Sequence, residues 1–306
     1  MIDLHGHYLP WMGDGASGLD EALSMVRMAE ADGVRLVVPT PTIDPRRAPP
    51  RRDDLERKFA AFAQLVQRRG IGLRLRLGAE LVHGPGAIDA IDRNEVPFLG
   101  EWEGRPVVLM RWAEDFIPIG AISATQEMAA RGLLPMLAHP ERNPGVARAP
   151  SALELFLRDG CLVQVDAGSV LGWHGPEVRD TAFRLIEAGM VTVLASGAAD
   201  TDTRPPMLRA ARDVVAQRFG EETALRLTEL NPSLVLAADL AHDVIADATA
   251  AAGGAETGSV RPPSSVPSRS PIAPPPPPGA AGIRGEVRAA VAQDGPPGPG
   301  LPLMRF

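Results

Sequence analysis

Two histidines separated by one residue stand near the start of the chain. His5 and His7 lie in the stretch Ile-Asp-Leu-His-Gly-His at residues 2–7. Residues i and i+2 of a β-strand project from the same face, so a strand here would direct both imidazoles to one point. Neutral imidazoles are common ligands of divalent metals. Because so short a motif often arises by chance, the pair alone leaves a metal site and two unrelated histidines equally open.

Residues 1–240 alternate short apolar segments with helical patterns. Helical stripes, such as the one formed by Leu55, Phe59 and Phe62, separate most of the apolar segments. Strands that alternate with helices predict a parallel sheet, and seven of them could close into a βα barrel. The segments predicted as strands are 2–6, 35–39, 73–79, 106–111, 134–138, 161–166 and 190–196.

Polar residues recur where these predicted strands end. In a βα barrel, the residues that carry the chemistry lie at the carboxyl ends of the strands. The residues at these ends are His5 and His7, Glu80, His139, and Asp166. A core or surface role could explain each residue singly. It explains poorly why three imidazoles and two carboxylates from four predicted strands all lie at the same end of those strands.

Composition excludes several classes of function. The 306 residues carry a net charge of −7, so the composition does not predict a positively charged surface for binding a nucleic acid. A single cysteine, Cys161, excludes an internal disulfide framework and suits a reducing cytoplasm. No apolar run reaches the length of a membrane span, and no signal peptide pattern is present. These features predict a cytoplasmic protein with no membrane span.

The last part of the chain, residues 241–306, differs sharply in composition. It contains Pro-Pro-Ser-Ser-Val-Pro-Ser-Arg-Ser-Pro-Ile-Ala-Pro-Pro-Pro-Pro-Pro-Gly at residues 262–279. Proline runs favour extended polyproline II conformations and do not build a packed core. We therefore expect a folded α/β domain at 1–240 and a low-complexity, disordered tail at 241–306.

Several motifs occur together and in a characteristic order. They are IDLHGHYLPWMGDGA at 2–16, EADGVRLVVPTP at 30–41, GAE at 78–80, PMLAHPERNP at 135–144, VQVDAGSVLGWHG at 163–175, VLAS at 193–196, RPPML at 204–208 and LNP at 230–232. With these motifs, the chain resembles the PHP (polymerase and histidinol phosphatase) superfamily. It is most similar to the PHP-type protein-tyrosine phosphatases of bacterial capsule and exopolysaccharide operons.

The resemblance implies a distorted seven-stranded (β/α)7 barrel and a cluster of divalent metals. Matched by motif, His5, His7, Glu80 and His139 would be metal ligands, and His139 would also take part in catalysis. Arg142 and Arg204 would hold the phosphate of the substrate. The implied metal is manganese, with zinc or iron as alternatives, and we expect one to two ions.

Four ligands that the family usually carries are missing. Thr42 stands where the family has histidine, and no glutamate occurs near Met110. Gly197 and Ala199 replace an aspartate and a histidine. Asp166, which stands where the family tends to carry asparagine, is the best-placed substitute and a further candidate ligand. These losses favour one retained metal site and place turnover in doubt.

Two functions therefore remain open. The first is a metal-dependent phosphoesterase that acts on phosphotyrosine in a protein, such as the tail of a bacterial tyrosine kinase, and so regulates capsule or exopolysaccharide synthesis. The second is a pseudophosphatase that binds phosphotyrosine or serves as a scaffold. A cysteine-dependent phosphatase is disfavoured, because Ala167 stands where a Cys-x5-Arg motif beginning at Cys161 would need arginine. The oligomeric state is not predicted.

The predicted tail can be tested by truncation. Removal of the residues after 245 should change the melting temperature by less than about 5 °C, because a disordered tail contributes no packing to the domain. Differential scanning calorimetry on the full-length and truncated chains measures this shift. A larger drop would show that the tail packs on the domain.

Overall fold

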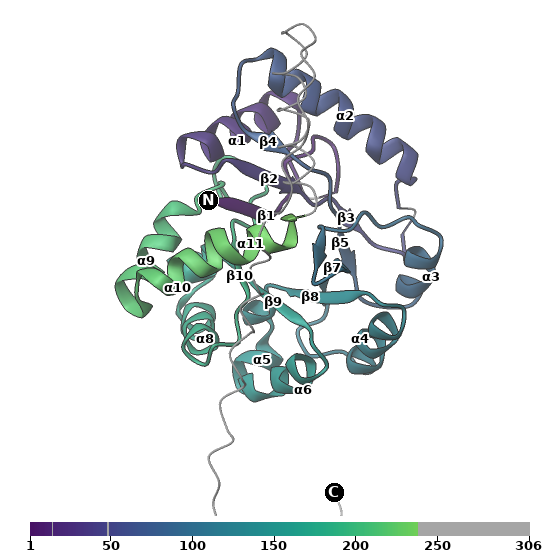
Figure 1. Cartoon of the computed structure of the whole chain (residues 1–306), viewed down its shortest axis with the longest axis vertical. Coiled ribbons are helices and arrows are strands. Elements are labelled where there is room, and N and C mark those ends of the chain that lie inside the picture. The colour runs from purple at the N-terminus through teal and green to yellow at the C-terminus, as the bar shows by residue number, and fades with distance from the viewer. Residues whose placement is uncertain (14, 48, 238–306) are drawn as a thin grey trace, which may run out of the picture. The chain divides into compact units, whose positions relative to one another are not determined.

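The computed structural model describes residues 1–13, 15–47 and 49–237, which form one α/β unit (Figure 1). The tail predicted at 241–306 lies outside the described residues, so its disorder stays a prediction. None of the described helices is long and apolar enough to cross a membrane.

The strands are mostly short and run in parallel. Their bounds are β1 Ile2–Gly6, β2 Leu36–Pro39, β3 Thr42–Ile43, β4 Arg74–Leu75, β5 Glu80–Val82, β6 Glu101–Trp102, β7 Arg105–Arg111, β8 Leu134–Ala138, β9 Leu162–Asp166 and β10 Val193–Ala195. They form a sheet of order β1-β2-β4 and a sheet of order β10-β9-β8-β7-β5-β3. β6 pairs with β7 and is the antiparallel exception. The predicted mixed α/β class with parallel strands is confirmed.

Backbone contacts join the two sheets on both sides. Gly6 and Ala198 form a parallel bridge, which brings β1 beside the segment that follows β10. On the other side, Gly78 N donates to Pro39 O at 3.0 Å and Glu80 N donates to Pro41 O at 3.1 Å. The segment predicted as one strand at 73–79 is instead divided into β4 and β5, so Glu80 begins a strand rather than following one.

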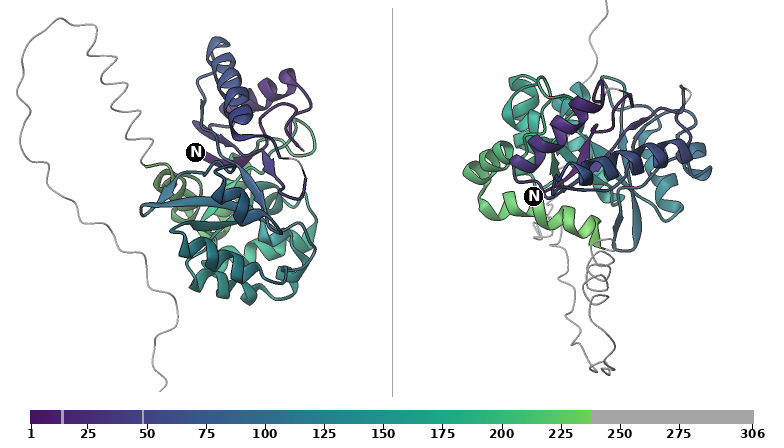
Figure 2. Two further views of the ribbon diagram at one scale, coloured as in Figure 1. Left: turned by 90° about the vertical axis from the view of Figure 1, so that its right-hand side faces the viewer. Right: turned by 90° about the horizontal axis from the view of Figure 1, so that it is seen from above.

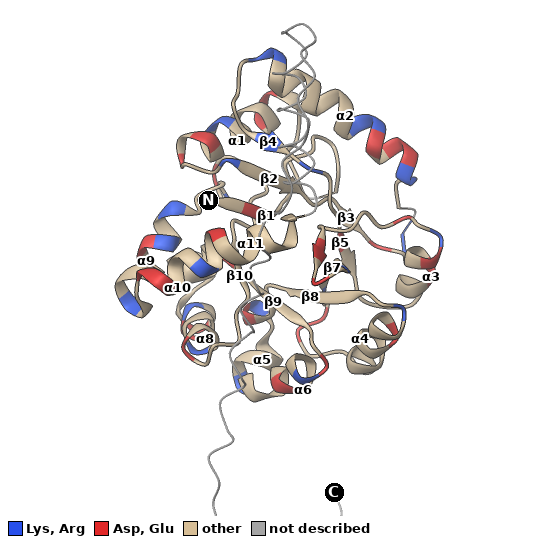
Figure 3. Cartoon of the chain, in the orientation of Figure 1, with Lys and Arg blue, Asp and Glu red and all other residues tan. Residues whose placement is uncertain are grey.

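Helices surround the strands in the view of Figure 1, and the two further views show them covering the outer faces (Figure 2). The larger helices are α1 Leu19–Ala31, α2 Arg52–Arg68, α4 Ala121–Ala130, α8 Pro176–Glu187 and α9 Arg209–Phe219. The shorter ones are α3 Ala87–Asp92, η1 Pro140–Arg142, α5 Pro144–Arg148, η2 Pro150–Ala152, α6 Leu153–Arg158, α7 Ala167–Leu171, α10 Glu221–Leu225, η3 Arg226–Leu230 and α11 Asn231–Val235. Charged residues gather on these outer helices, and the strands are largely uncharged (Figure 3).

The alternation of side chains along the strands produces two apolar cores. One core fills the space between the strands and the helices, and Met110 and Val163 belong to it. The other core lies on the opposite face of the strands, and Val235 and Leu236 at the end of α11 pack into it. Its strand residues are Ile2, Leu4, Leu36, Val38, Val107, Leu109, Leu134, Met136, Ala138, Val193 and Ala195.

An irregularity in β1 decides where the first histidine points. The register between β1 and β2 shifts between Asp3 and Gly6, and such a bulge turns the following side chains to the other face. Regular alternation would place Asp3 and His5 on one face. Instead, Asp3 accepts hydrogen bonds from Ser196 N at 2.8 Å and Ser196 Oγ at 2.6 Å, whereas His5 contacts Gln164.

The buried carboxylate of Asp3 holds β1 against the segment after β10. Tyr8 Oη donates to Asp3 Oδ2 at 2.8 Å, in addition to the two bonds from Ser196. Burial raises the pKa of Asp3, although the hydrogen bonds from Ser196 and Tyr8 act against this rise. The network fixes the end of the strand on which His5 lies.

This network predicts a measurable loss of stability in Asp3→Ala. The substitution leaves Ser196 N–H and two hydroxyl groups without their buried acceptor, so the free energy of unfolding should fall by about 2–4 kcal/mol. Asp3→Asn retains one oxygen and should lose less. Urea denaturation of the three proteins measures the difference, and an Asp3→Ala protein as stable as wild type would contradict the role of the network.

Candidate metal centre and phosphate site

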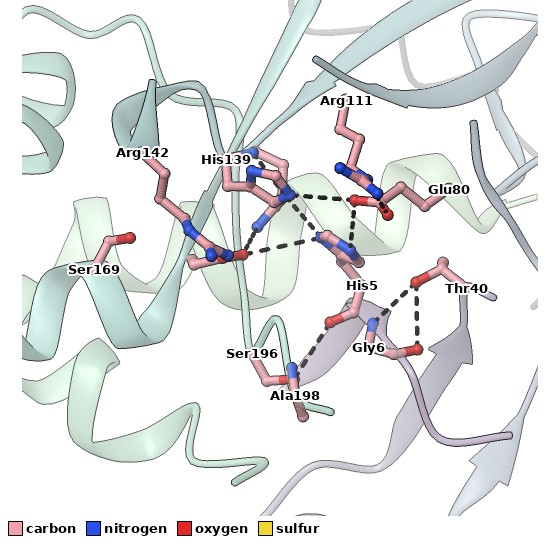
Figure 4. A network of polar contacts seen from close by, with 12 residues as sticks. His5, Gly6, Thr40, Glu80, Arg111, His139, Arg142, Ser169, Ser196 and Ala198 are labelled. Carbon is pink, nitrogen blue, oxygen red and sulfur yellow. Dashed lines mark hydrogen bonds and ion pairs between the residues drawn. The ribbon is translucent and has the colours of Figure 1, made fainter. Parts of the chain in front are cut away.

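Polar side chains converge at the carboxyl ends of the parallel strands. His5 lies near the end of β1, His139 directly follows β8, and Arg142 lies in the η1 turn after it. Figure 4 shows His5 and His139 next to Glu80, with Arg142 on the other side of the histidines. Ligands commonly bind at the carboxyl edge of parallel strands, because loops there can present side chains from several strands.

Three of the predicted ligands form a compact group. His5, His7 and Glu80 are buried, and one ligand atom from each lies within 4.8 Å of the other two. Within the described residues, the buried Nε2 of His5 forms no hydrogen bond, although Glu80 Oε1 lies 3.4 Å from it. Two buried imidazoles and a buried carboxylate that face one point fit a divalent cation, because a catalytic metal site commonly has three protein ligands and an open position.

Glu80 stands at the centre of the polar contacts. Its Oε1 lies 3.4 Å from His5 Nε2 and 3.2 Å from His139 Nε2. Its Oε2 accepts from Thr42 Oγ1 at 3.1 Å and pairs with Arg111 Nε at 2.9 Å. Burial disfavours the carboxylate, but the neighbouring imidazoles of His139 and His5 hold the pKa of Glu80 well below its usual range. The group therefore stays ionised, as a metal ligand must.

The second nitrogen of His5 is also fixed. Nδ1 lies 2.9 Å from Gln164 Oε1 and 3.9 Å from Asp166 Oδ1. Burial alone would lower the pKa of His5, but the nearby carboxylates of Glu80 and Asp166 raise it to about 9. The contact to Gln164 orients the ring so that Nε2 points at Glu80, which is the usual support for a metal-binding histidine.

His139 occupies a strained backbone position. Its φ of 36° and ψ of 49° lie in the left-handed region, which residues other than glycine rarely adopt. Backbone contacts hold it there, including His139 N to Gln164 O at 2.8 Å. Such strain is often concentrated at functional sites. Here it turns the chain from β8 directly into η1 and aims the imidazole at Glu80.

Arg142 and Asp166 form an ion pair beside the histidines. Arg142 Nη1 lies 3.1 Å from Asp166 Oδ2, and Gln164 Nε2 donates to Asp166 Oδ1 at 2.9 Å. Burial disfavours the Asp166 carboxylate, but the charges of His139, His5 and Arg142 lower its pKa. Asp166 thus faces the Nδ1 side of His5 and orients Arg142. Its assignment as a metal ligand stays a prediction.

The space next to Asp166 accounts for one of the missing ligands. A Cβ added at Gly197 would lie 2.5 Å from Asp166 Oδ1, and Gly197 has a φ of 60°. The carboxylate of Asp166 therefore fills the space that an aspartate at position 197 would need. A side chain at position 197 would collide with the Asp166 carboxylate in its present position.

Glu141 accepts hydrogen bonds from residues next to the site. Its Oε1 accepts from Ser169 Oγ at 2.7 Å and from Asp166 N at 3.0 Å, and its Oε2 has no hydrogen-bond partner among the described residues. Burial and the charge of Asp166 raise the pKa of Glu141. A neutral Glu141 can hold the backbone of Asp166 without placing a second negative charge beside it.

A cavity of about 170 Å³ opens next to these residues. It is lined in part by Arg111, Trp112, His139 and Arg142. Arg204 lies in the loop after β10. Burial lowers the pKa of His174, and the charges of Arg142 and Arg204 act in the same direction. The assignment of Arg204 to the phosphate site stays a prediction.

The family model described as "Capsular polysaccharide synthesis, CpsB/CapC" matches residues 1–237. The chain belongs to the CpsB/CapC family. Tyrosine-protein phosphatase YwqE of Bacillus subtilis is 29% identical over 244 residues, which cover 77% of this chain and 91% of the relative. Tyrosine-protein phosphatase CpsB of Streptococcus agalactiae is 23% identical over 241 residues, which cover 77% of this chain and 98% of the relative.

A solved structure agrees with this assignment to the CpsB/CapC family. A chain from the crystal structures of YwqE from Bacillus subtilis and CpsB from Streptococcus pneumoniae, described as metal-dependent tyrosine phosphatases, matches with a TM-score of 0.71. The match has 26% sequence identity and covers 77% of this chain and 94% of that chain. The resemblance inferred from the motifs is confirmed.

One residue of the site in this CpsB/CapC member, Arg111, was not predicted from the sequence. Met110, near the end of the fourth predicted strand, packs into the core. Arg111 is the residue whose guanidinium reaches Glu80. Strand alternation could have identified it, because Val107, Leu109 and Arg111 share a face.

The site predicts that metal binding is coupled to proton release. Without an ion, His5 has a pKa of about 9 and is protonated at pH 7, whereas a ligating imidazole must be neutral. The affinity for Mn²⁺ should therefore rise by roughly tenfold per pH unit as the pH increases toward 9. Isothermal titration in buffers of different ionisation enthalpy measures the released protons. An affinity that is constant between pH 6 and 8 would contradict the role of His5.

His5→Ala should remove the metal uptake that wild type shows, measured by elemental analysis after dialysis. Asp202→Ala is the control, because Asp202 is exposed in the loop after β10 and should leave uptake unchanged. Circular dichroism shows whether both variants are folded. Equal metal content in His5→Ala and wild type would refute the site.

Proposed function

We propose that this protein is a metal-dependent phosphoesterase that removes phosphate from phosphotyrosine in a protein. The observation that carries the proposal is the group formed by His5, His7 and Glu80, which lies beside a cavity lined by His139 and Arg142. The named relatives are tyrosine-protein phosphatases, which supports phosphotyrosine as the target. The family description supports a role in capsule or exopolysaccharide synthesis.

The donors His5, His7 and Glu80, with His139 beside them, would hold the divalent ion. We propose manganese, with zinc and iron as alternatives, because imidazole and carboxylate ligands suit all three. When bound, the ion would supply Lewis acidity for phosphate ester hydrolysis. Gln164 keeps the ring of His5 in orientation, and Thr42 and Arg111 keep the carboxylate of Glu80 in place.

Arg142 would bind the phosphate oxygens of the substrate. Its side chain is one-third exposed, lines the cavity and is oriented by Asp166. A guanidinium can make two parallel charge-assisted hydrogen bonds to phosphate, so a fixed arginine both binds and positions the group. We propose that Arg204 contributes a second positive charge to the same substrate.

We further propose that the two sheets act as one distorted seven-stranded barrel. β2 with β3 and β4 with β5 would then be two interrupted strands. The hydrogen bonds that join the sheets at Pro39 and Pro41, and the bridge at Gly6, support this. We also propose a domain boundary near residue 240 and a cytoplasmic location. As the substrate we propose the tail of a tyrosine kinase.

Cys161 is excluded as the nucleophile by its surroundings. It is buried, and burial raises the pKa of its thiol to about 11. A thiol is nucleophilic only as the thiolate, which this environment suppresses at neutral pH. A covalent phosphocysteine route therefore has no competent residue at this position.

Substitutions separate these roles in an assay of aryl phosphate hydrolysis. Arg142→Ala should lower turnover by about a hundredfold, because it removes charge-assisted hydrogen bonds to the phosphate. Cys161→Ser should keep turnover within about twofold of wild type. Release of phosphate in the presence of Mn²⁺ measures both. Loss of activity in Cys161→Ser would contradict the metal-dependent route.

The same assay tests the alternative of a pseudophosphatase. Wild type that shows no turnover with manganese, zinc or iron, yet binds a phosphotyrosine peptide, would overturn the proposed enzyme. It would establish a binding module in its place.

A further inference from the structure

The two oxygens of the buried Glu80 carboxylate face different kinds of group. Oε1 lies near the Nε2 atoms of His5 and His139, and unprotonated imidazole nitrogens can bind a metal. Oε2 lies 2.9 Å from Arg111 Nε and accepts from Thr42 at 3.1 Å. A guanidinium has donors only and stays charged, so it cannot be a ligand. The two sides of Glu80 therefore differ in their ability to hold an ion.

The fold brings Arg111 to this position. It is the last residue of β7, where its backbone pairs with Val82 of the neighbouring strand β5. Arg111 shares a strand face with Leu109, which lies opposite Glu80 in the pairing of β7 with β5. Figure 4 shows its side chain directed at the Glu80 carboxylate. The contact follows from the strand register rather than from a surface side chain that folds back.

We propose that the guanidinium of Arg111 takes the place of a second cation beside Glu80, so that the centre binds a single divalent ion on the side of His5 and His7. A second ion that shared Oε2 would lie next to a fixed positive charge and would be repelled. Arg111 supplies positive charge there without needing metal from solution. This inference rests on the proposed function.

The remaining donors of Arg111 can serve the substrate. Its side chain is 28% exposed and lines the cavity together with His139 and Arg142. Two arginines on different strand ends match the dianionic charge of a phosphate group, since each can donate to separate oxygens. Arg111 thereby fills both roles of the absent cation, because it neutralises Glu80 and attracts the phosphate.

Metal stoichiometry tests the first role. Wild type, titrated with Mn²⁺ and measured by calorimetry and elemental analysis, should bind one ion per chain. Arg111→Glu removes the positive charge and adds a carboxylate, and it should bind two. Arg111→Lys keeps the charge and should bind one. Two ions in wild type, or one ion in a folded Arg111→Glu protein, would overturn the inference.

Phosphate binding tests the second role and does not depend on Arg111→Glu being folded. Arg111→Gln should weaken the binding of inorganic phosphate to the Mn²⁺-loaded protein by about tenfold, because charge-assisted hydrogen bonds are lost. Arg105→Gln is the matched control at the opposite end of the same strand and should bind as wild type does. Equal phosphate affinity in Arg111→Gln and wild type would refute this role.

The outcomes distinguish this inference from the proposed function. The expected stoichiometries without aryl phosphate turnover would leave the single-ion centre standing and overturn the proposed enzyme. Turnover by a wild-type protein that binds two ions would support the enzyme and overturn the role of Arg111. A wild-type protein that binds no ion would overturn both.

Discussion

The structure of the site depends on one buried carboxylate, Glu80. An isolated ionised carboxylate inside a protein is strongly unfavourable unless cations and hydrogen-bond donors surround it. Around Glu80 these are the imidazoles of His5 and His139, the guanidinium of Arg111 and the hydroxyl of Thr42. Each of these groups comes from a different strand or strand end. The carboxylate therefore joins segments that are distant in the sequence, and it keeps a negative charge ready for a metal.

Around this centre, the polar groups are arranged so that neighbouring charges alternate. Asp166 balances Arg142 and faces His5, whereas Glu141, whose pKa is raised, holds the backbone of Asp166. A raised pKa in one carboxyl group and a lowered pKa in its neighbour is the expected result when two acids share a buried region. The protein thus keeps one negative charge beside Arg142 and avoids the repulsion of two.

The losses relative to the family pattern are connected with gains elsewhere. Gly197 lacks a side chain where Asp166 fills the space, and Thr42 donates to the same oxygen of Glu80 that Arg111 contacts. In the proposed single-ion centre, these residues take the space and the contacts of the ligands that the resemblance implies. A member of the CpsB/CapC family can therefore carry fewer metal ligands than the family usually has.

Much of this could be predicted from the sequence, because the strand pattern and the position of polar residues after each strand are local properties. The α/β class, the strands at 2–6 and 134–138, and the convergence of His5, His7 and Glu80 follow from periodicity and motif order.

Only the tertiary structure decided which partners these residues meet. The bulge in β1 separates Asp3 from His5, the interruption of the predicted strand at 73–79 makes Glu80 the start of β5, and the register of β7 brings Arg111 rather than Met110 to the site. Register, bulges and the space beside Asp166 depend on pairing between segments far apart in the chain, and a one-residue shift in such pairing exchanges the faces of a strand.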